Sequence, residues 1–511
     1  MASLFHKCSR NFVKFRVFSV LLVLLVLFAT NIIIEAQSPA GLNPELKWRY
    51  MRQAYKNPSM HTIIQPWYMA EIQEGDSGSI DQSRSFHYFI HPLANVQLAA
   101  GASFRQRYGA GVHAGISLGK SLSVDFNYAL NGRQFPGCEQ AYIDTTGLIP
   151  HYDRYLTHHN DFYLFQSLNF SISWTPVKYI TVRAGKDRQF WGDGYRSMYL
   201  SDNADSYPFL QTIFKVWHIK YMFMTTRMSD YQLSEHFSAR HKKFTSMHTL
   251  SWNITPGINV NLFETVVWDA VDSVSKRTFD MNYMNPVVVL RPVDYSLGSP
   301  DNILIGFGAK VKVWRELYLY GQLVLDEFKF DELKAANGWW ANKYAFQAGA
   351  RCFLGEQRPA MLQAEFNQVR PYNGTHYYTL QNYGHLADPL AHPMGANLRE
   401  GLVIARWAFA PKWSAHAMLT YAVQGTDSVG TNFGGDIYKS NLTRMKEYGN
   451  KTLQGVRATT AYQELKIART LVEKWNLQAE VVMSNRLFRR EGKTQNDFYF
   501  SIGVKTLLYR D

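Results

Sequence analysis

The stretch Ser121–Tyr128, SLSVDFNY, carries the pattern that decides the fold of this chain. Every second residue is apolar, from Leu122 to Tyr128, and the residues between them are Ser, Asp or Asn. Successive side chains of a β-strand point to opposite faces, so the alternation predicts a strand with one apolar and one polar face. The same alternation recurs at residues 112–118, 168–174, 362–367, 413–421, 475–481 and 498–506.

A soluble β-sandwich would alternate in the same way, so other features must decide between the two classes. Aromatic residues stand at strand ends, at Trp174, Trp413, Tyr421 and Trp475, which is typical of a membrane-interface girdle. The chain is 15% aromatic, yet its mean hydropathy is only −0.26, as expected when half of each strand faces a wet lumen. We therefore predict an all-β fold, a large antiparallel transmembrane β-barrel. A strand-plus-turn unit of about 25 residues would give roughly 16–20 strands.

The first 36 residues have the layout of a secretory signal peptide. A basic start precedes the unbroken apolar run VFSVLLVLLVLFA (17–29), and Ala36 follows as a cleavage site. An uncleaved anchor is the competing interpretation, because residues 17–34 barely reach spanning length, but Asn31 interrupts them. The predicted organisation is a signal peptide (1–36), an N-terminal periplasmic segment with a short helix (37–92) and an outer-membrane barrel (93–511).

Within the N-terminal segment, Asn43 and Pro44 form a helix start, with Asn as N-cap and Pro in the first turn. The helix is expected to run to about Lys56 and to cover something at a barrel mouth. Long, extracellular loops are predicted at 144–159, 330–343 and 425–449, where the alternation stops.

The basic character of the chain does not indicate nucleic acid. The formal net charge is +13, but the Lys and Arg residues are scattered, with no block of five or more. Two cysteines follow the signal segment, Cys138 and Cys352. They either pair in an oxidising compartment or are two unrelated small residues.

Enzyme signatures are scarce. There is no H-E-x-x-H, no phosphate-binding loop and no pair of Asp residues at i and i+2. His158, His159 and Asp161 suggest metal ligands, but adjacent histidines on a strand point to opposite faces, so a solvated loop is favoured. We predict no catalytic residues, no metal and no cofactor.

Two stretches carry the residue types that bind sugars, AGKDRQFWGDGYRSMYLSDN (184–203) and FNQVRPYNGTHYY (366–378). Aromatic faces contact pyranose rings, Asp, Asn, Arg and His bind hydroxyls, and Arg forks onto the carboxylates of acidic sugars. The competing interpretation is structural: girdle aromatics, and a charge ladder that holds the wall in shape. The candidate polysaccharide-binding residues are Lys186, Asp187, Arg188, Trp191, Asp193, Tyr195, Arg370, Tyr372, His376, Tyr378 and His385.

These two stretches, together with 279–302 and 381–397, resemble the capsule-assembly Wzi family of outer-membrane barrels, and more closely its Bacteroidetes members related to the gliding-motility protein RemB. The resemblance implies an 18-stranded barrel in the outer membrane of a Gram-negative bacterium. It implies a non-enzymatic role in holding capsular or surface polysaccharide, or a role in gliding or adhesion. The implied partners are that polysaccharide, outer-membrane lipid, and capsule-export or gliding machinery. A general diffusion porin and an outer-membrane hydrolase stay open as alternatives.

Overall fold

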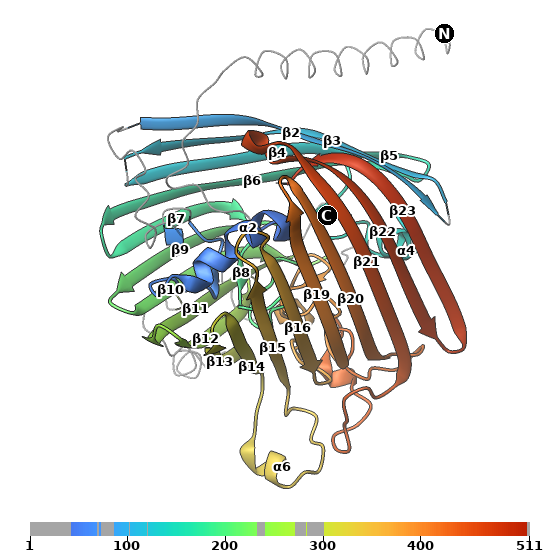
Figure 1. The fold of residues 1–511 in the computed structure, drawn as a ribbon. Coiled ribbons are helices and arrows are strands. Elements are labelled where there is room, and N and C mark those ends of the chain that lie inside the picture. The colour runs from blue at the N-terminus through green and yellow to red at the C-terminus, as the bar shows by residue number, and fades with distance from the viewer. Residues whose placement is uncertain are drawn as a thin grey trace.

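The computed structural model describes residues 42–68, 71–72, 86–101, 103–119, 121–231, 241–270, 283 and 301–507. The expected signal peptide and nearly all of the 279–302 stretch lie outside these ranges. Within them, the chain forms a closed antiparallel β-barrel (Figure 1). The wall has eighteen long strands, and the short strand β5 pairs with β6 beside them. The predicted fold class and the 18 strands are confirmed.

Each wall strand pairs with its neighbours in antiparallel register, and the last strand closes on the first, from Asn95↔Lys505 to Gly101↔Tyr499. The wall strands are β2 (Phe86–Gly101), β3 (Arg105–Leu118), β4 (Leu122–Gln134), β6 (Phe162–Val177), β7 (Ile180–Asp187), β9 (Tyr207–Val216), β10 (Ile219–Ser229), β11 (Lys242–Thr255), β12 (Ile258–Asp269), β13 (Asn302–Trp314), β14 (Leu317–Leu325), β15 (Tyr344–Leu354), β16 (Ala360–Val369), β19 (Leu398–Ala410), β20 (Trp413–Thr426), β21 (Val456–Val472), β22 (Leu477–Arg490) and β23 (Lys493–Thr506). The other elements are α2 (Pro44–Lys56), β1 (Ile64–Gln65), α4 (Gly137–Thr146), β5 (Thr157–His159), β8 (Phe190–Trp191), α6 (Phe330–Lys334), η2 (Thr379–Gln381), β17 (Gly384–His385), β18 (Asp388–Pro389), η3 (Asn441–Thr443) and η4 (Glu473–Trp475).

The alternation read from the sequence separates the two faces of the wall. On β4, Phe126 is 39% exposed on the outer face, whereas Ser123 on the lumen face is 8% exposed. Exposed tryptophans gather at one end of the outer wall, at positions 174, 217, 252, 314, 407 and 413. Such a belt is typical of barrels that cross a membrane. Trp475, expected at the start of a strand, lies in the η4 turn because β22 begins only at Leu477.

The two ends of the barrel differ in their connections. At the end with the tryptophans, β6 and β7 are joined by residues 178–179 and β19 and β20 by residues 411–412; we call this the short-turn end. At the opposite, long-loop end, the connections include 326–343, 370–397 and 427–455. Figure 1 shows the loop with α6 projecting beyond the rim at that end. The loops expected near 144–159, 330–343 and 425–449 all fall there.

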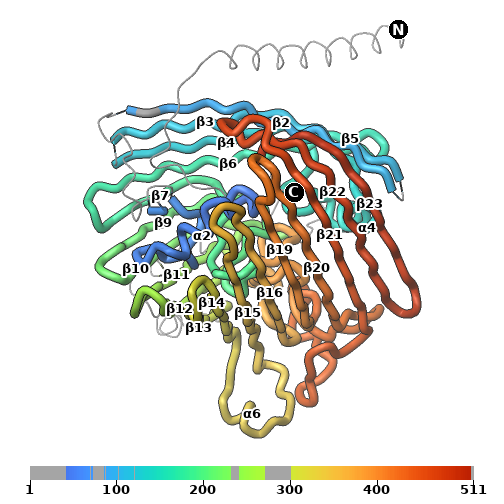
Figure 2. The backbone as a smooth tube through the Cα atoms, in the orientation of Figure 1, coloured from blue at the N-terminus to red at the C-terminus, as the bar shows by residue number. Residues whose placement is uncertain are grey.

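Helix α2 lies within the ring of strands at the short-turn end (Figure 2). Asn43 caps it as predicted, because its side-chain oxygen accepts hydrogen bonds from the backbone N–H groups of Glu45 (2.9 Å) and Leu46 (3.2 Å). Its apolar face, with Met51 and Tyr55, packs against lumen-facing wall residues such as Phe353, Met361 and Leu402. The helix therefore fills part of the lumen near a barrel mouth.

Three further features of the structure concern the start of the wall, the two cysteines and the helices. The first wall strand begins at Phe86, ahead of the boundary expected at residue 93, because Phe86 to Leu93 continue the pairing with β3. Cys138 and Cys352 are free cysteines in this structure. In the described part of the chain, no helix is both long and apolar enough to cross a membrane.

Candidate polysaccharide-binding site

The connection between β7 and β9, residues 188–206, folds into the lumen. There β8 pairs with β1 of the N-terminal segment, Trp191 opposite Ile64. Trp191 has no exposed surface, and its ring meets that of Phe263 on β12 edge to face at 6.0 Å. A fully buried indole offers no free face to a sugar ring in this conformation, so replacing Trp191 by Ala would test packing rather than sugar contact.

Asp193 joins this loop to the N-terminal segment and to the wall. Its carboxylate accepts hydrogen bonds from the hydroxyl groups of Thr62 and Tyr55, the latter at 3.1 Å, and lies 3.8 Å from the Lys310 ammonium of β13. The side chain is 6% exposed. Asp193 thus acts as a buried cross-link between segments that are distant in sequence.

The tip of the same loop docks on two wall carboxylates. Glu365 of β16 accepts hydrogen bonds from the backbone N–H groups of Tyr195 (2.8 Å) and Arg196 (3.1 Å). The Arg196 guanidinium forks onto Glu400 of β19 at 2.9 and 3.1 Å. Burial opposes the charge of Arg196, but Glu400 outweighs burial and raises the pKa of Arg196 above its ordinary value. Sequence reasoning missed Arg196 because its partner lies 204 positions away.

Arg188 performs a similar structural role. Its guanidinium lies 3.5 Å from Asp205 and over the Tyr152 ring at 5.0 Å, and it donates to the backbone oxygen of His151. Burial raises the pKa of Asp205 above its ordinary value, although Arg188 opposes that rise. Arg188 therefore ties the loop after α4 to the end of the 188–206 loop.

The structure brings the end of the 188–206 loop together with the 381–397 stretch. The Tyr383 hydroxyl donates to the backbone oxygen of Tyr199 at 2.7 Å, and Ser201 donates from its backbone N–H to the backbone oxygen of Leu390 at 2.6 Å. The rings of His385 and Tyr207 meet edge to face at 5.7 Å. The contact is a packed interior, in which the predicted residue His385 is buried.

The remaining predicted residues divide between wall, interior and surface. Lys186 pairs with Phe170 and so lies on the outer face of β7, whereas the neighbouring Asp187 lies on the lumen face. Tyr372 is fully buried, and its hydroxyl donates to the backbone oxygen of Asn432 at 2.8 Å. His376 is 4% exposed, His385 5% and Tyr378 41%. Arg370 is half-buried, with its guanidinium over the Tyr344 ring.

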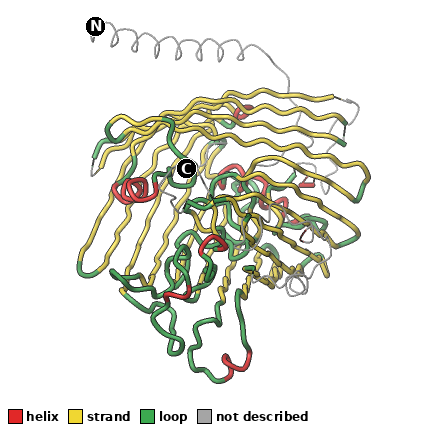
Figure 3. The backbone as a smooth tube through the Cα atoms, turned by 180° about the vertical axis from the view of Figure 1, so that it is seen from behind, coloured by secondary structure: helices red, strands yellow, loops and turns green. Residues whose placement is uncertain are grey.

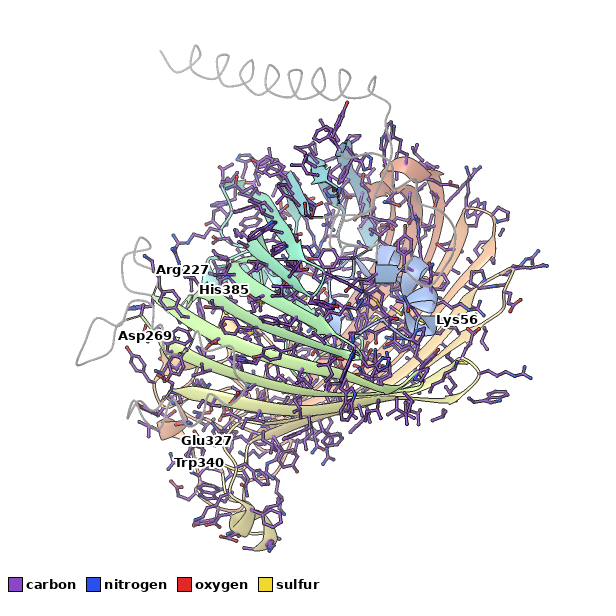
Figure 4. All side chains as sticks on the ribbon, turned by 90° about the vertical axis from the view of Figure 1, so that its left-hand side faces the viewer. Lys56, Arg227, Asp269, Glu327, Trp340 and His385 are labelled. Atoms are coloured by element: carbon purple, nitrogen blue, oxygen red, sulfur yellow. The ribbon has the colours of Figure 1, made fainter. Side chains whose placement is uncertain are left out.

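Three loops at the long-loop end form one surface, which we call the cap (residues 326–343, 370–397 and 427–455). The backbone N–H of Trp340 donates to the backbone oxygen of Glu447 at 2.9 Å, and the backbone N–H of Gly449 donates to that of Asn337 at 2.8 Å. The Ser440 hydroxyl donates to the backbone oxygen of Tyr377 at 2.7 Å. These bonds hold the loops in fixed relative positions, and Figure 4 shows Trp340 and Glu327 at the base of the projecting loop.

The cap exposes aromatic rings with cations beside them. Tyr377 is 42% exposed and Tyr448 53%, and Phe330 stands out further on α6. The half-buried Trp339 and Trp340 have Lys329 at 5.8 Å and Arg444 at 4.3 Å from their respective ring centres. Of the residues predicted from the sequence, Tyr378 lies on this surface.

A basic recess also lies in the lumen near the long-loop end. It has a volume of about 250 Å³ between the lumen face of β2–β4, the start of α4 and β22–β23. Four arginines line it, Arg105, Arg107, Arg133 and Arg486, against two acids. The acids are Glu139, 3.2 Å from Arg133, and Asp497, 3.6 Å from Arg486. The recess therefore carries an excess of guanidinium groups, which suits an acidic ligand.

No catalytic arrangement stands out in the described ranges. One G-x-S-x-G motif, the sequence of a serine-hydrolase nucleophile elbow, occurs at Gly115–Gly119. Its Ser117 lies within β3, opposite Ser123 of β4, and not at the strand-to-helix turn of a nucleophile elbow. Among the described residues, no group of three or more His, Cys, Asp or Glu side chains is placed to hold a metal ion.

Three solved structures illustrate what this chain is similar to. Wzi of Escherichia coli, an outer-membrane protein involved in group 1 capsule assembly and described as a carbohydrate-binding β-barrel, aligns with a TM-score of 0.55 at 12% identity, over 89% of this chain and 97% of its own. OccK7 of Pseudomonas aeruginosa aligns with a TM-score of 0.43 at 10% identity, over 82% of this chain and 98% of its own. OprD of the same species aligns with a TM-score of 0.43 at 8% identity, over 84% of this chain and 98% of its own. No protein-family model and no curated protein matches the sequence. The likeness to Wzi at this identity is a likeness of fold.

Proposed function

We propose that this protein is a non-enzymatic outer-membrane β-barrel that binds polysaccharide at the cell surface through the cap and the basic recess. The observation that carries the proposal is the set of exposed aromatic rings with neighbouring cations on the cap. Ring faces match the apolar side of a pyranose, and Lys and Arg match the carboxylates of acidic sugars. The recess beside the cap extends the same chemistry into the lumen.

The proposed location rests on the outer wall. Its apolar face and its tryptophan belt fit outer-membrane lipid as a partner. In bacterial barrels the short turns face the periplasm and the long loops face outward. The cap would then lie on the cell surface, where exported polysaccharide is present.

The proposed physiological role is retention of capsule or slime, with surface gliding or adhesion as a neighbouring role. The description of Wzi as a carbohydrate-binding barrel of capsule assembly supports the first. The sequence resemblance to RemB-like proteins of the Bacteroidetes is the basis of the second. Capsule-export or gliding machinery would be the protein partner in either role.

A wide diffusion pore fits the structure less well. In the described part of the chain, α2 enters the lumen from the short-turn end and the 188–206 loop from the long-loop end, and the two meet where β1 pairs with β8. Figure 3 shows helices and loops inside the wall when the barrel is viewed from behind. A hydrolase would need a nucleophile and base brought together, and Ser117 is not placed for that role.

Replacing Trp339, Tyr377 and Tyr378 together by Ala is expected to weaken polysaccharide binding about ten-fold or more, because exposed aromatic anchors dominate binding energy. Binding of fluorescent acidic polysaccharide to cells that display equal amounts of barrel measures the effect. Phe104→Ala is the matched control, because Phe104 is 63% exposed at the same end of the barrel but lies outside the cap. Equal binding by the triple variant and by Phe104→Ala would rule out the cap as the binding surface.

A further inference from the structure

A second cavity lies at the opposite end of the barrel from the cap. It has a volume of about 850 Å³ between α2 and the lumen face of β19–β22. Helix α2 contributes Trp48 and Arg49, β19 contributes Arg406, and β22 contributes Gln478. Its size falls within the range of small-ligand pockets, roughly 300–1,000 Å³.

Arg406 distinguishes this cavity from ordinary packing. Its Cα partners Met361 and His416 place it on the lumen face, and it is only 6% exposed. It makes no hydrogen bond or ion pair with any residue in the described ranges. Glu45 and Glu464 act on its charge without forming an ion pair with it, so the guanidinium can take a further anionic partner.

Other cations around the cavity have carboxylate partners. Lys466 lies 2.5 Å from Glu45, Arg52 lies 2.7 Å from Glu316, and Lys412 lies 3.5 Å from Glu473. Arg406 therefore lacks the carboxylate partner that these three cations have.

Arg49 of α2 is a second guanidinium without a carboxylate. Its nitrogens donate to the side-chain oxygens of Asn476 at 2.9 Å and Thr470 at 3.3 Å, which are neutral groups. Arg49 and Arg406 both line the cavity. The planar fork of a guanidinium matches a carboxylate, sulfate or phosphate, so the pair marks a site for an oxyanion.

We propose that this cavity binds an acidic oligosaccharide through Arg406 and Arg49. Trp48 supplies an aromatic surface, and the side chains of Gln53, Ser414 and Gln478 supply groups for hydroxyls. The cavity lies on the lumen side of the wall, away from lipid, which argues against a phospholipid headgroup. With the short turns in the periplasm, the ligand would be an exported acidic polymer in transit or a cell-wall glycan carrying lactyl carboxylates. The site does not depend on the function proposed for the cap.

Calorimetric titration of the full-length protein in detergent micelles tests the site. The probes are tetragalacturonate, a muramic-acid-containing disaccharide and neutral maltotetraose. We expect one of the acidic probes to bind in the background of the cap triple variant, with an affinity that falls as salt is added. Arg406→Gln should weaken that binding roughly ten-fold or more, since hydrogen bonds to charged groups are strong. The acidic probe that binds distinguishes a uronic acid polymer from a cell-wall glycan.

Arg469→Gln is the matched control, because this substitution removes the same charge from an arginine that faces outward. Arg469 lies on β21, over the Trp413 ring. Arg406→Gln should unfold close to the parental temperature, because Arg406 makes no hydrogen bond or ion pair within the described ranges that the substitution would break. Heat-modifiable migration on gels confirms that each variant forms the barrel. Equal affinity for maltotetraose, no binding of either acidic probe, or unchanged binding by Arg406→Gln would overturn the proposal, and none of these results would bear on the cap.

Discussion

Deleting residues 44–67 is expected to raise the steady conductance of the barrel in planar lipid bilayers on the order of ten-fold or more. Barrels of 16–18 strands enclose an aqueous channel when nothing fills them. Here the deleted segment packs Met51 and Tyr55 against the lumen wall and supplies β1, the partner of β8. Its removal frees the volume of α2 and takes two hydrogen-bond donors, Tyr55 and Thr62, away from Asp193.

The wall itself should survive this deletion. Closure runs through β2 and β23, which pair from Asn95 to Gly101 without any contribution from the deleted segment. The 188–206 loop keeps its anchors on Glu365 and Glu400. We therefore expect an open channel that is narrower than an unfilled barrel of this size.

The control deletes residues 330–336, the α6 part of the loop that projects beyond the rim in Figure 1. That deletion leaves the lumen unchanged, so conductance should stay at the parental level. A parent that already conducts like an open porin, with no change in either deletion, would contradict the filled lumen and favour the diffusion-pore alternative.

The wall was predictable because its information is local. The alternation at Leu122–Tyr128 predicts which residues face outward whatever the rest of the chain does, and the same holds at 168–174 and 362–367. The helix start at Asn43 is equally local, because the N-capping side chain and the backbone N–H groups that donate to it lie within three positions of each other. The start of the first strand was less predictable. Residues 86–93 belong to it because they pair with β3, which lies later in the chain.

The interior was not predictable for the opposite reason. Trp191 is buried because Ile64 lies opposite it, 127 positions earlier in the chain, and no short window of sequence records that pairing. A loop rich in Trp, Tyr, Asp and Arg has the composition of a sugar site whether it faces water or folds into a lumen. Composition therefore does not distinguish the accessible residues of these loops from the buried ones: Tyr378 is exposed, whereas Tyr372 is fully buried.

Lys343→Met is expected to destabilise the cap by about 3–5 kcal/mol, because breaking a buried ion pair leaves one charge uncompensated. The Lys343 ammonium lies 3.1 Å from Asp326, with both side chains fully buried, and donates to the backbone oxygen of Thr375 at 3.1 Å. Asp326 also accepts a hydrogen bond from the Gly374 N–H at 2.7 Å. The pair thus joins the ends of β14 and β15 to the 370–397 loop, and its loss should release that loop.

The loss should depend on pH in a defined direction. Burial raises the pKa of the Asp326 carboxyl above its ordinary value, and Lys343 opposes that rise, so the substitution should raise this pKa further. A group whose pKa is higher in the folded state binds its proton more tightly there, and its ionisation opposes folding. The destabilisation of Lys343→Met should therefore be small while the pH is below the raised folded-state pKa of Asp326, where the carboxyl keeps its proton with or without Lys343, and should grow as the pH rises through that pKa.

Proteolysis of the cap, followed across pH against unfolding of the wall by heat-modifiable migration, separates local release from global unfolding. Lys451→Met is the control, because Lys451 is an exposed residue of the cap. This substitution removes the same charge without breaking a buried ion pair. Adding Asp326→Asn to Lys343→Met should recover part of the lost stability and flatten the pH profile, because the uncompensated carboxylate is gone. If Lys343→Met and Lys451→Met give the same pH profile, the pair does not hold the cap, and the exposed rings would owe their positions to the backbone hydrogen bonds between the loops alone.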